Sequence, residues 1–186
     1  MNNQTKIVLD TEFTSLTQGA QLLSLALVAE TGEKFYAEFN DFEKKNISTW
    51  IENNVISNFL MNDEETHFSV NNKTTKLKGD KEYIVDHLRD WLNQFGTIEM
   101  WADVPHYDWV LFCELFGGSM NLPKNLHFMC LDLATLLCAN GIDYKTDRVS
   151  LLDNKNEMPN NYRIHNALSD AELTLILVKK YSHGKN

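Results

Sequence analysis

The order of apolar segments along the chain is the feature that most constrains its fold. Residues 5–10, 20–29 and 33–39 each have the apolar pattern of a buried strand, and they follow one another directly. Thr31-Gly32 separates the last two and favours a hairpin. From residue 80 onward, helical and strand patterns alternate instead. Three consecutive strands followed by this alternation predict an α/β fold, with a mixed β-sheet flanked by α-helices.

The later segments carry recognisable start and stop signals. Ser48, Asp80 and Asp132 are suitable N-caps, whereas Gly96 and Gly141 are suitable ends. The predicted helices are 48–61, 80–95, 106–116, 132–140 and 166–181, and the further predicted strands are 97–102 and about 127–131. The stretch 62–79 is polar, and we interpret it as a surface excursion.

Size and composition favour one globular domain over residues 1–186. The 186 residues are 43% hydrophobic, which suffices for a sizeable core, and neither a secretory signal nor a membrane span is evident. The three cysteines stand at unrelated spacings inside apolar stretches. This pattern is typical of buried free thiols, so it predicts a cytoplasmic protein and disfavours a zinc site.

The net charge of −9 limits how the chain can bind nucleic acid. Proteins that grip a duplex through many phosphate contacts usually have a basic surface. An acidic enzyme can still process nucleic acid if it holds only a few nucleotides and if metal ions neutralise the reacting phosphate. The charge therefore predicts weak, local binding at the end of a nucleic-acid strand.

Asp10 and Glu12 place two carboxylates at the end of the first predicted strand. Side chains two residues apart on a strand point to the same face, so both carboxylates project together. Such a pair is repulsive unless a cation lies between its members. The alternative is that Asp10 and Glu12 have no function and are polar only because a β-strand ends there.

Asp108 and Asp170 lie on helix faces that are otherwise apolar. Asp108 is close to a helix start, so it is either a capping residue or a metal ligand. Asp170 lies one turn inside the last helix, in the middle of the apolar face. A buried ion without a partner is costly, and we therefore favour a metal ligand at Asp170.

His165 lies at the start of this last helix, either in the loop before it or at its first residue. A lone histidine is more often structural than catalytic, but this one lies five residues before Asp170, where the helix meets the sheet edge. An imidazole with a pKa near neutrality could deprotonate a water molecule there.

Taken together, these residues resemble three motifs of the DEDDh 3'–5' exonuclease superfamily, which has the ribonuclease H-like fold. Asp10-Thr11-Glu12 is similar to the first motif, Tyr107-Asp108 to the second, and residues 165–170, of the form His-x-Ala-x-x-Asp, to the third. The opening 10–14 and the segment 102–109 resemble the small bacterial and phage exoribonucleases. Asp103 stands in the region where most relatives have an asparagine.

The resemblance implies hydrolysis of phosphodiesters with two Mg²⁺ or Mn²⁺ ions. Asp10, Glu12 and Asp170 would hold one ion, and Asp10 would share the second with Asp108. His165 would act as the general base.

The resemblance also implies contacts with the terminal nucleotide of the substrate. Thr14 would contribute backbone and hydroxyl contacts, Leu16 would be a wedge against the base, and Phe13 would either stack or pack in the core. Asp103 and His106 are further candidates at the rim of the site.

The preferred hypothesis is an exoribonuclease that trims single-stranded RNA 3' ends to nucleoside 5'-monophosphates. Its rivals are a DNA exonuclease of the same mechanism, a non-catalytic nucleic-acid-binding module, and an acidic scaffold with capping aspartates. Many relatives act as dimers, so the resemblance allows a homodimer, to which an exposed aromatic residue such as Trp50 could contribute. No partner for a ribose 2'-hydroxyl can be identified from the sequence.

Overall fold

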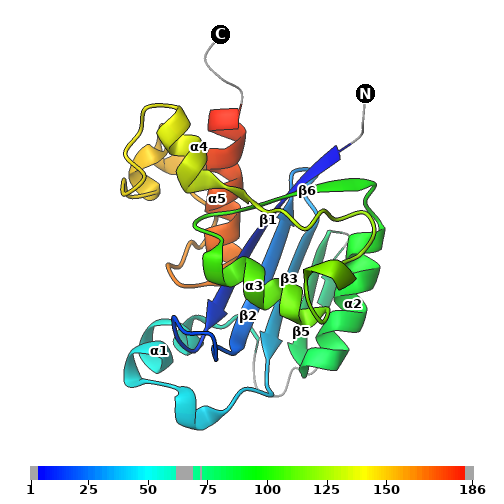
Figure 1. Ribbon diagram of the computed structural model, residues 1–186. Coiled ribbons are helices and arrows are strands. Elements are labelled where there is room, and N and C mark those ends of the chain that lie inside the picture. The colour runs from blue at the N-terminus through cyan, green and yellow to red at the C-terminus, as the bar shows by residue number, and fades with distance from the viewer. Residues whose placement is uncertain (1–3, 62–68, 72, 183–186) are drawn as a thin grey trace.

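The computed structural model describes residues 4–61, 69–71 and 73–182. The strands are β1 (Gln4–Phe13), β2 (Leu22–Ala29), β3 (Lys34–Phe39), β4 (Ser69–Asn71), β5 (Thr74–Gly79), β6 (Thr97–Ala102) and β7 (Leu131–Asp132). The α-helices are α1 (Thr49–Asn54), α2 (Lys81–Asn93), α3 (His106–Leu115), α4 (Leu133–Ala139) and α5 (Ala167–Ser182) (Figure 1). Short 3-10 helices are η1 (Lys44–Asn46), η2 (Ile56–Asn58), η3 (Ser119–Asn121), η4 (Val149–Leu151) and η5 (Lys155–Glu157).

The strands form one mixed sheet in the order β4-β5-β3-β2-β1-β6-β7. The pairs β1–β2, β2–β3 and β4–β5 are antiparallel, whereas β3–β5, β1–β6 and β6–β7 are parallel. The predicted hairpin at Thr31-Gly32 joins β2 to β3, and Gly32 has a φ of 102°, a conformation that glycine adopts without strain. The predicted α/β fold with a mixed, helix-flanked sheet is confirmed.

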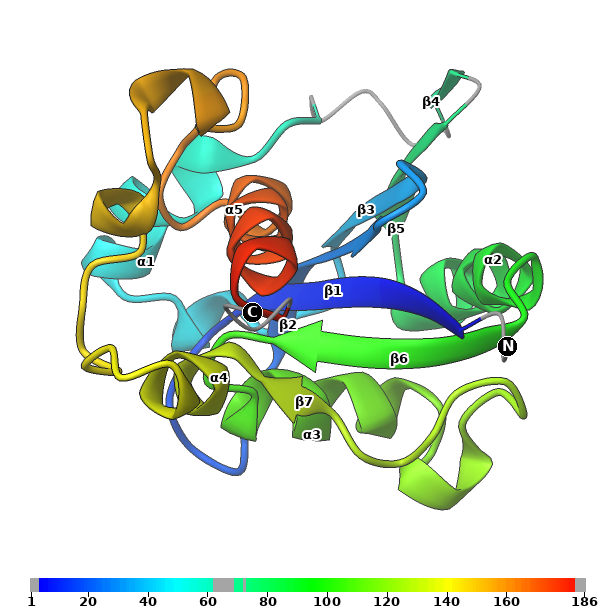
Figure 2. The same cartoon turned by 90° about the horizontal axis from the view of Figure 1, so that it is seen from above.

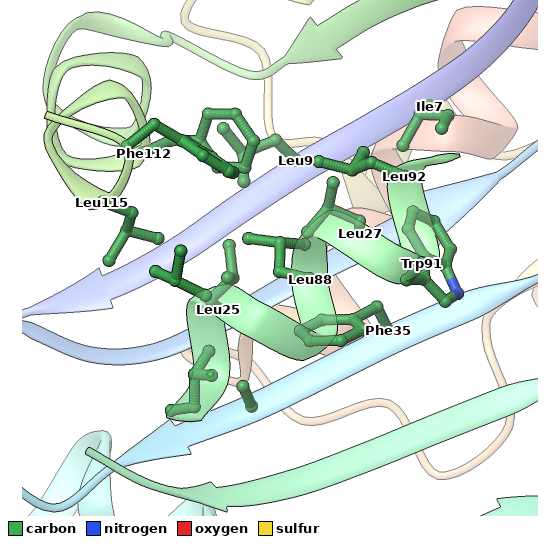
Figure 3. Packing of buried hydrophobic residues seen from close by; sticks show 14 of the residues in the cluster. Ile7, Leu9, Leu25, Leu27, Phe35, Leu88, Trp91, Leu92, Phe112 and Leu115 are labelled. Atoms are coloured by element: carbon green, nitrogen blue, oxygen red, sulfur yellow. The ribbon is translucent and has the colours of Figure 1, made fainter. Parts of the chain in front are cut away.

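The sheet separates two apolar layers, with α5 on one side of β1 and α3 on the other (Figure 2). Successive side chains of β1 pack into the two layers in turn. Ile7 and Leu9 point towards α2 and α3, whereas Val8 points towards α5. Figure 3 shows the first layer, in which Leu88 of α2 and Phe112 of α3 pack against the strands. The second layer joins α4 and α5 to the opposite face. The direction of each β1 side chain is therefore fixed by burial on both faces.

The helices begin largely where their caps predict. Asp80 accepts a hydrogen bond from the Tyr83 amide at the start of α2, and Asp132 accepts bonds from the amides of Ala134 and Thr135 at the start of α4. Among the described residues, no helix combines the length and the hydropathy that a membrane crossing requires.

The prediction for residues 62–79 is wrong over the part that the structure describes. Residues 69–71 and 74–79 are strands β4 and β5 at the sheet edge, while 62–68 and 72 lie outside the described residues. Backbone pairing with β3 determines this edge, in the parallel register Lys34↔Thr74. Strand β5 lies between β3 and the outermost strand β4, and its backbone hydrogen bonds to both do not depend on apolar side chains, which explains its polar sequence.

Three predicted boundaries also differ. The helix at 48–61 is shorter, because α1 ends at Asn54 and the 3-10 turn η2 follows it. The strand near 127–131 is only Leu131–Asp132. Strand β1 continues to Phe13, so Asp10 and Glu12 lie within the strand instead of beyond its end. Pairing of β1 with β2 extends through these positions.

Candidate active site

Three carboxylates meet where β1 passes under the first turn of α5. Asp10 and Glu12 project from the same face of β1, as alternation requires, and Asp170 comes down from α5. One carboxylate oxygen from each residue lies within 4.8 Å of one oxygen from each of the others. The structure thus brings together residues that are 160 positions apart at most.

The electrostatics of this cluster favour a bound cation. Burial raises the pKa of Asp10 well above its usual range, and the charges of Asp108, Asp170 and Glu12 raise it further. Burial and the charges of Asp170 and Asp108 raise the pKa of Glu12 to about 8. The pKa of Asp170 is also raised by burial. An all-oxygen donor set of repelling carboxylates is chemically suited to Mg²⁺ or Mn²⁺.

Asp108 approaches this strand from the opposite face of the sheet. Its Oδ1 accepts hydrogen bonds from the Thr11 amide at 2.9 Å and from Thr11 Oγ1 at 2.7 Å. Helix α3 begins two residues earlier, at His106, and no side chain caps it. Asp108 is thus bonded to the residue between Asp10 and Glu12, and its charge raises the pKa of both carboxyl groups.

His165 lies beside the cluster, half-buried and immediately before the cap of α5. Its charge and the backbone bonds of His165 and Asn166 lower the pKa of Asp170, against the larger effect of burial. The edge of its ring faces Trp50, with 5.1 Å between the ring centroids and an interplanar angle of 71°. His165 also has a φ of 59°, in the left-handed region. Trp50 is 55% exposed, so it adds an exposed aromatic surface next to the cluster.

The predicted nucleotide contacts lie in the loop after β1. Leu16 is 71% exposed, and its carbonyl accepts a hydrogen bond of 2.9 Å from Tyr107 Oη of α3. The Phe13 and Tyr107 rings are 5.8 Å apart. Thr14 is buried; its amide donates to the Gln21 carbonyl and its Oγ1 accepts from the Gln21 amide, both at 3.0 Å. The Leu16 side chain is therefore accessible, whereas these Thr14 groups already have partners.

Comparison with known proteins agrees with this geometry. A family model described as the 3'-5' exoribonuclease Rv2179c-like domain matches residues 5–181.

The chain belongs to this family.

Two relatives, 3'-5' exoribonuclease Rv2179c and 3'-5' exoribonuclease MT2234.1, come from Mycobacterium tuberculosis strains H37Rv and CDC 1551. Each is 29% identical over 119 residues, which are 63% of this chain and 64% of the relative. The alignment thus spans just under two thirds of these relatives. Membership of the Rv2179c-like family confirms the predicted resemblance to the small 3'-5' exoribonucleases, and it is consistent with the DEDDh superfamily.

Asp103, a candidate at the rim, is paired in the structure. Its carboxylate accepts hydrogen bonds from Arg148 Nε at 2.6 Å and Arg148 Nη2 at 2.8 Å. Arg148 Nη1 also donates to the carbonyls of Tyr144 and Thr146. This bidentate pair ties the loop after α4 to the end of β6. His106, the other rim candidate, is exposed at the first residue of α3.

Tyr162 lies next to the carboxylate cluster, and sequence reasoning missed it. Its Oη donates a 2.8 Å hydrogen bond to Asp170 Oδ1. The bond lowers the pKa of the Asp170 carboxyl group, partly offsetting the effect of burial. Tyr162 lies in a polar loop without periodicity, and only its proximity to Asp170, eight residues later, could have drawn attention to it. Arg148 was missed for the same reason.

Proposed function

We propose that this chain is a metal-dependent 3'-5' exoribonuclease that releases nucleoside 5'-monophosphates from single-stranded RNA. The observation that carries the proposal is the carboxylate cluster of Asp10, Glu12 and Asp170, within a chain that matches the exoribonuclease family over residues 5–181. The activity printed in the names of the two mycobacterial relatives supports it. We also propose that residues 1–186 form a single exonuclease domain.

The residues that would hold metal are the three carboxylates of the cluster together with Asp108. Asp10, Glu12 and Asp170 would bind one divalent ion, and Asp10 and Asp108 would serve a second. When bound, Mg²⁺ or Mn²⁺ would neutralise charge on the scissile phosphate and acidify the attacking water. Tyr162 would orient Asp170 by donating a hydrogen bond to its Oδ1.

His165 would remove the proton from the attacking water. Its position next to the cap of α5, beside the carboxylates, supports this role, because histidine is the commonest general base in enzymes. The 3'-terminal nucleotide would lie against the exposed side chain of Leu16, with Phe13, Thr14, Asp103 and His106 as further proposed contacts or supports. Since no charged surface for a long duplex is required, the proposal also suits a net charge of −9.

The cellular setting and the assembly are further proposals. Cys113, Cys130 and Cys138 are free thiols, which supports a reducing cytoplasm, although only Cys113 is buried as predicted, because Cys130 is half-buried and Cys138 is exposed. The resemblance allows a homodimer, and light scattering on the purified protein would decide between monomer and dimer.

The test is degradation of 5'-labelled single-stranded RNA and of the matching DNA, with Mg²⁺, Mn²⁺ or EDTA. We expect metal-dependent shortening of RNA from the 3' end with release of mononucleotides, and a loss of about 100-fold or more in Asp170→Asn. Asp86→Asn is the matched control, because Asp86 is exposed on α2.

Two results would replace the proposal. Faster cleavage of DNA would identify an exodeoxyribonuclease of the same mechanism. A folded protein that binds Mn²⁺ and RNA but cleaves neither substrate would be a binding module.

A further inference from the structure

The backbone of His165 is held in an unusual conformation. Its φ of 59° lies in the left-handed region, which residues with a side chain rarely occupy. Such a conformation persists when the surrounding structure determines it. The contacts on either side of His165 should therefore show what holds this residue in place.

Two asparagines form hydrogen bonds on either side of His165. Asn58 Nδ2 donates to the carbonyl of Ile164 at 3.0 Å, on the N-terminal side of the histidine. Asn166 Nδ2 donates to the carbonyl of Asn58 at 2.8 Å, on its C-terminal side. Asn166 is 2% exposed, and its Oδ1 also accepts the Ser169 amide at 3.2 Å, as an N-cap of α5. One residue from a distant segment is thus bonded to both neighbours of His165.

The segment that carries Asn58 is itself anchored to the sheet. Oε1 of Glu38, a completely buried residue of β3, accepts the amides of Leu60 at 2.7 Å and Met61 at 3.0 Å. It also accepts the hydroxyl of Tyr36 at 2.8 Å. Asn58 Nδ2 has a second acceptor in the carbonyl of Asn54, at 2.7 Å. Asn58 therefore joins His165 to a rigid part of the molecule.

From these contacts we propose that Asn58 is a positioning residue for His165 in catalysis, an inference that rests on the proposed exoribonuclease function. The Asn58 side chain donates to the carbonyl of Ile164, directly before His165, and among the described residues it makes no hydrogen bond to the three carboxylates, so its direct effect is on the backbone that carries the imidazole. A general base that is displaced by a fraction of an ångström loses efficiency while substrate binding persists. Loss of Asn58 should accordingly lower kcat and leave KM and the affinity for Mn²⁺ nearly unchanged.

The test is a double-mutant cycle between Asn58→Ala and His165→Ala, with Asn53→Ala as control. Asn53 is exposed on α1. We expect kcat to fall about 10- to 100-fold in Asn58→Ala, with KM within about threefold, and to be unchanged in the control. In the His165→Ala background, Asn58→Ala should cause no further loss, because its effect passes through the imidazole. Equal losses in both backgrounds, or a loss confined to KM, would overturn the proposal.

Asn58→Asp is the second variant, in case Asn58→Ala does not fold. This variant keeps the size of the side chain, and its backbone carbonyl can still accept from Asn166. It lacks the Nδ2 group that donates to Ile164 and Asn54, so it should show the same loss in kcat.

An NMR measurement separates this proposal from the proposed function. The His165 ring lies 5.1 Å from the Trp50 ring, so its Cε1–Hε1 resonance is sensitive to its position. That resonance, assigned with His165→Ala, should shift in Asn58→Asp and not in Asn53→Ala, whether or not the protein cleaves RNA. An unshifted resonance would overturn the positioning role. If the resonance shifts but the wild-type protein does not cleave RNA, the proposed function is wrong and the positional effect of Asn58 on His165 stands.

Discussion

Replacement of Glu12 by glutamine should stabilise the metal-free protein, although it removes a proposed metal ligand. The pKa of Glu12 is raised from 4.5 to about 8 by burial and by the charges of Asp170 and Asp108. Between these values the unfolded chain is ionised while the folded protein retains the proton. The unfolded state thus binds fewer protons, and the free energy of unfolding falls as the pH rises from about 4.5 to 8.

The magnitude follows from the same interval. One pKa unit corresponds to about 1.4 kcal/mol, so the penalty accumulated over the roughly 2.5 pH units between pH 4.5 and pH 7 is at most about 3.5 kcal/mol. Glutamine has the same shape and no charge, and it avoids this penalty. For a chain of this size, Glu12→Gln should raise Tm at pH 7 by up to roughly 10 °C in EDTA.

The assay is thermal unfolding in EDTA at pH 5 and pH 7.5, repeated with Mn²⁺. The variant should exceed the wild type most at pH 7.5, and the difference should shrink towards pH 5. Mn²⁺ at 100 times its Kd should stabilise the wild type by about 2.7 kcal/mol and the variant much less. Glu82→Gln, an exposed substitution on α2, should change stability by no more than about 0.5 kcal/mol. A Glu12→Gln protein that is less stable than the wild type in EDTA at pH 7.5 would show that the Glu12 carboxyl group does not destabilise the metal-free fold.

Two further predictions concern the surroundings of the cluster. Tyr162→Phe removes the hydroxyl that donates to Asp170, so the Kd for Mn²⁺ should increase about 10-fold by calorimetry; an unchanged Kd would contradict this role. Leu16→Ala should raise KM for RNA without lowering Tm, because the 71% exposed side chain contributes little to the core. A substantial drop in Tm would show that Leu16 is a packing residue instead.

The sequence predicts the cluster well because its residues follow regular patterns. Asp10 and Glu12 are two residues apart in a buried strand, and Asp170 interrupts an apolar helix face, so both anomalies are visible without coordinates. The Asp132 cap is visible for the same reason. Local periodicity thus determines which side chains face the site.

Residues that reach the site through tertiary contacts could not be found in this way. Asp108 could be a cap or a ligand by sequence, and its bonds to Thr11 depend on how α3 packs on β1. Tyr162 and Arg148 come from loops, whose paths depend on the completed fold. Strand β5 was missed because its pairing with β3 is a backbone interaction, for which its polar side chains give no signal.

The first turn of α3 forms hydrogen bonds both with Leu16, the predicted nucleotide contact, and with β1, which carries Asp10 and Glu12. Tyr107 bonds to the Leu16 carbonyl, and the next residue, Asp108, bonds to Thr11 between the two carboxylates of β1. A substrate that displaces Leu16 would therefore act on the proposed metal ligands through two adjacent residues of one helix. Thermodynamic linkage then requires reciprocity: RNA that tightens Mn²⁺ binding by some factor must itself bind more tightly, by the same factor, when Mn²⁺ is present.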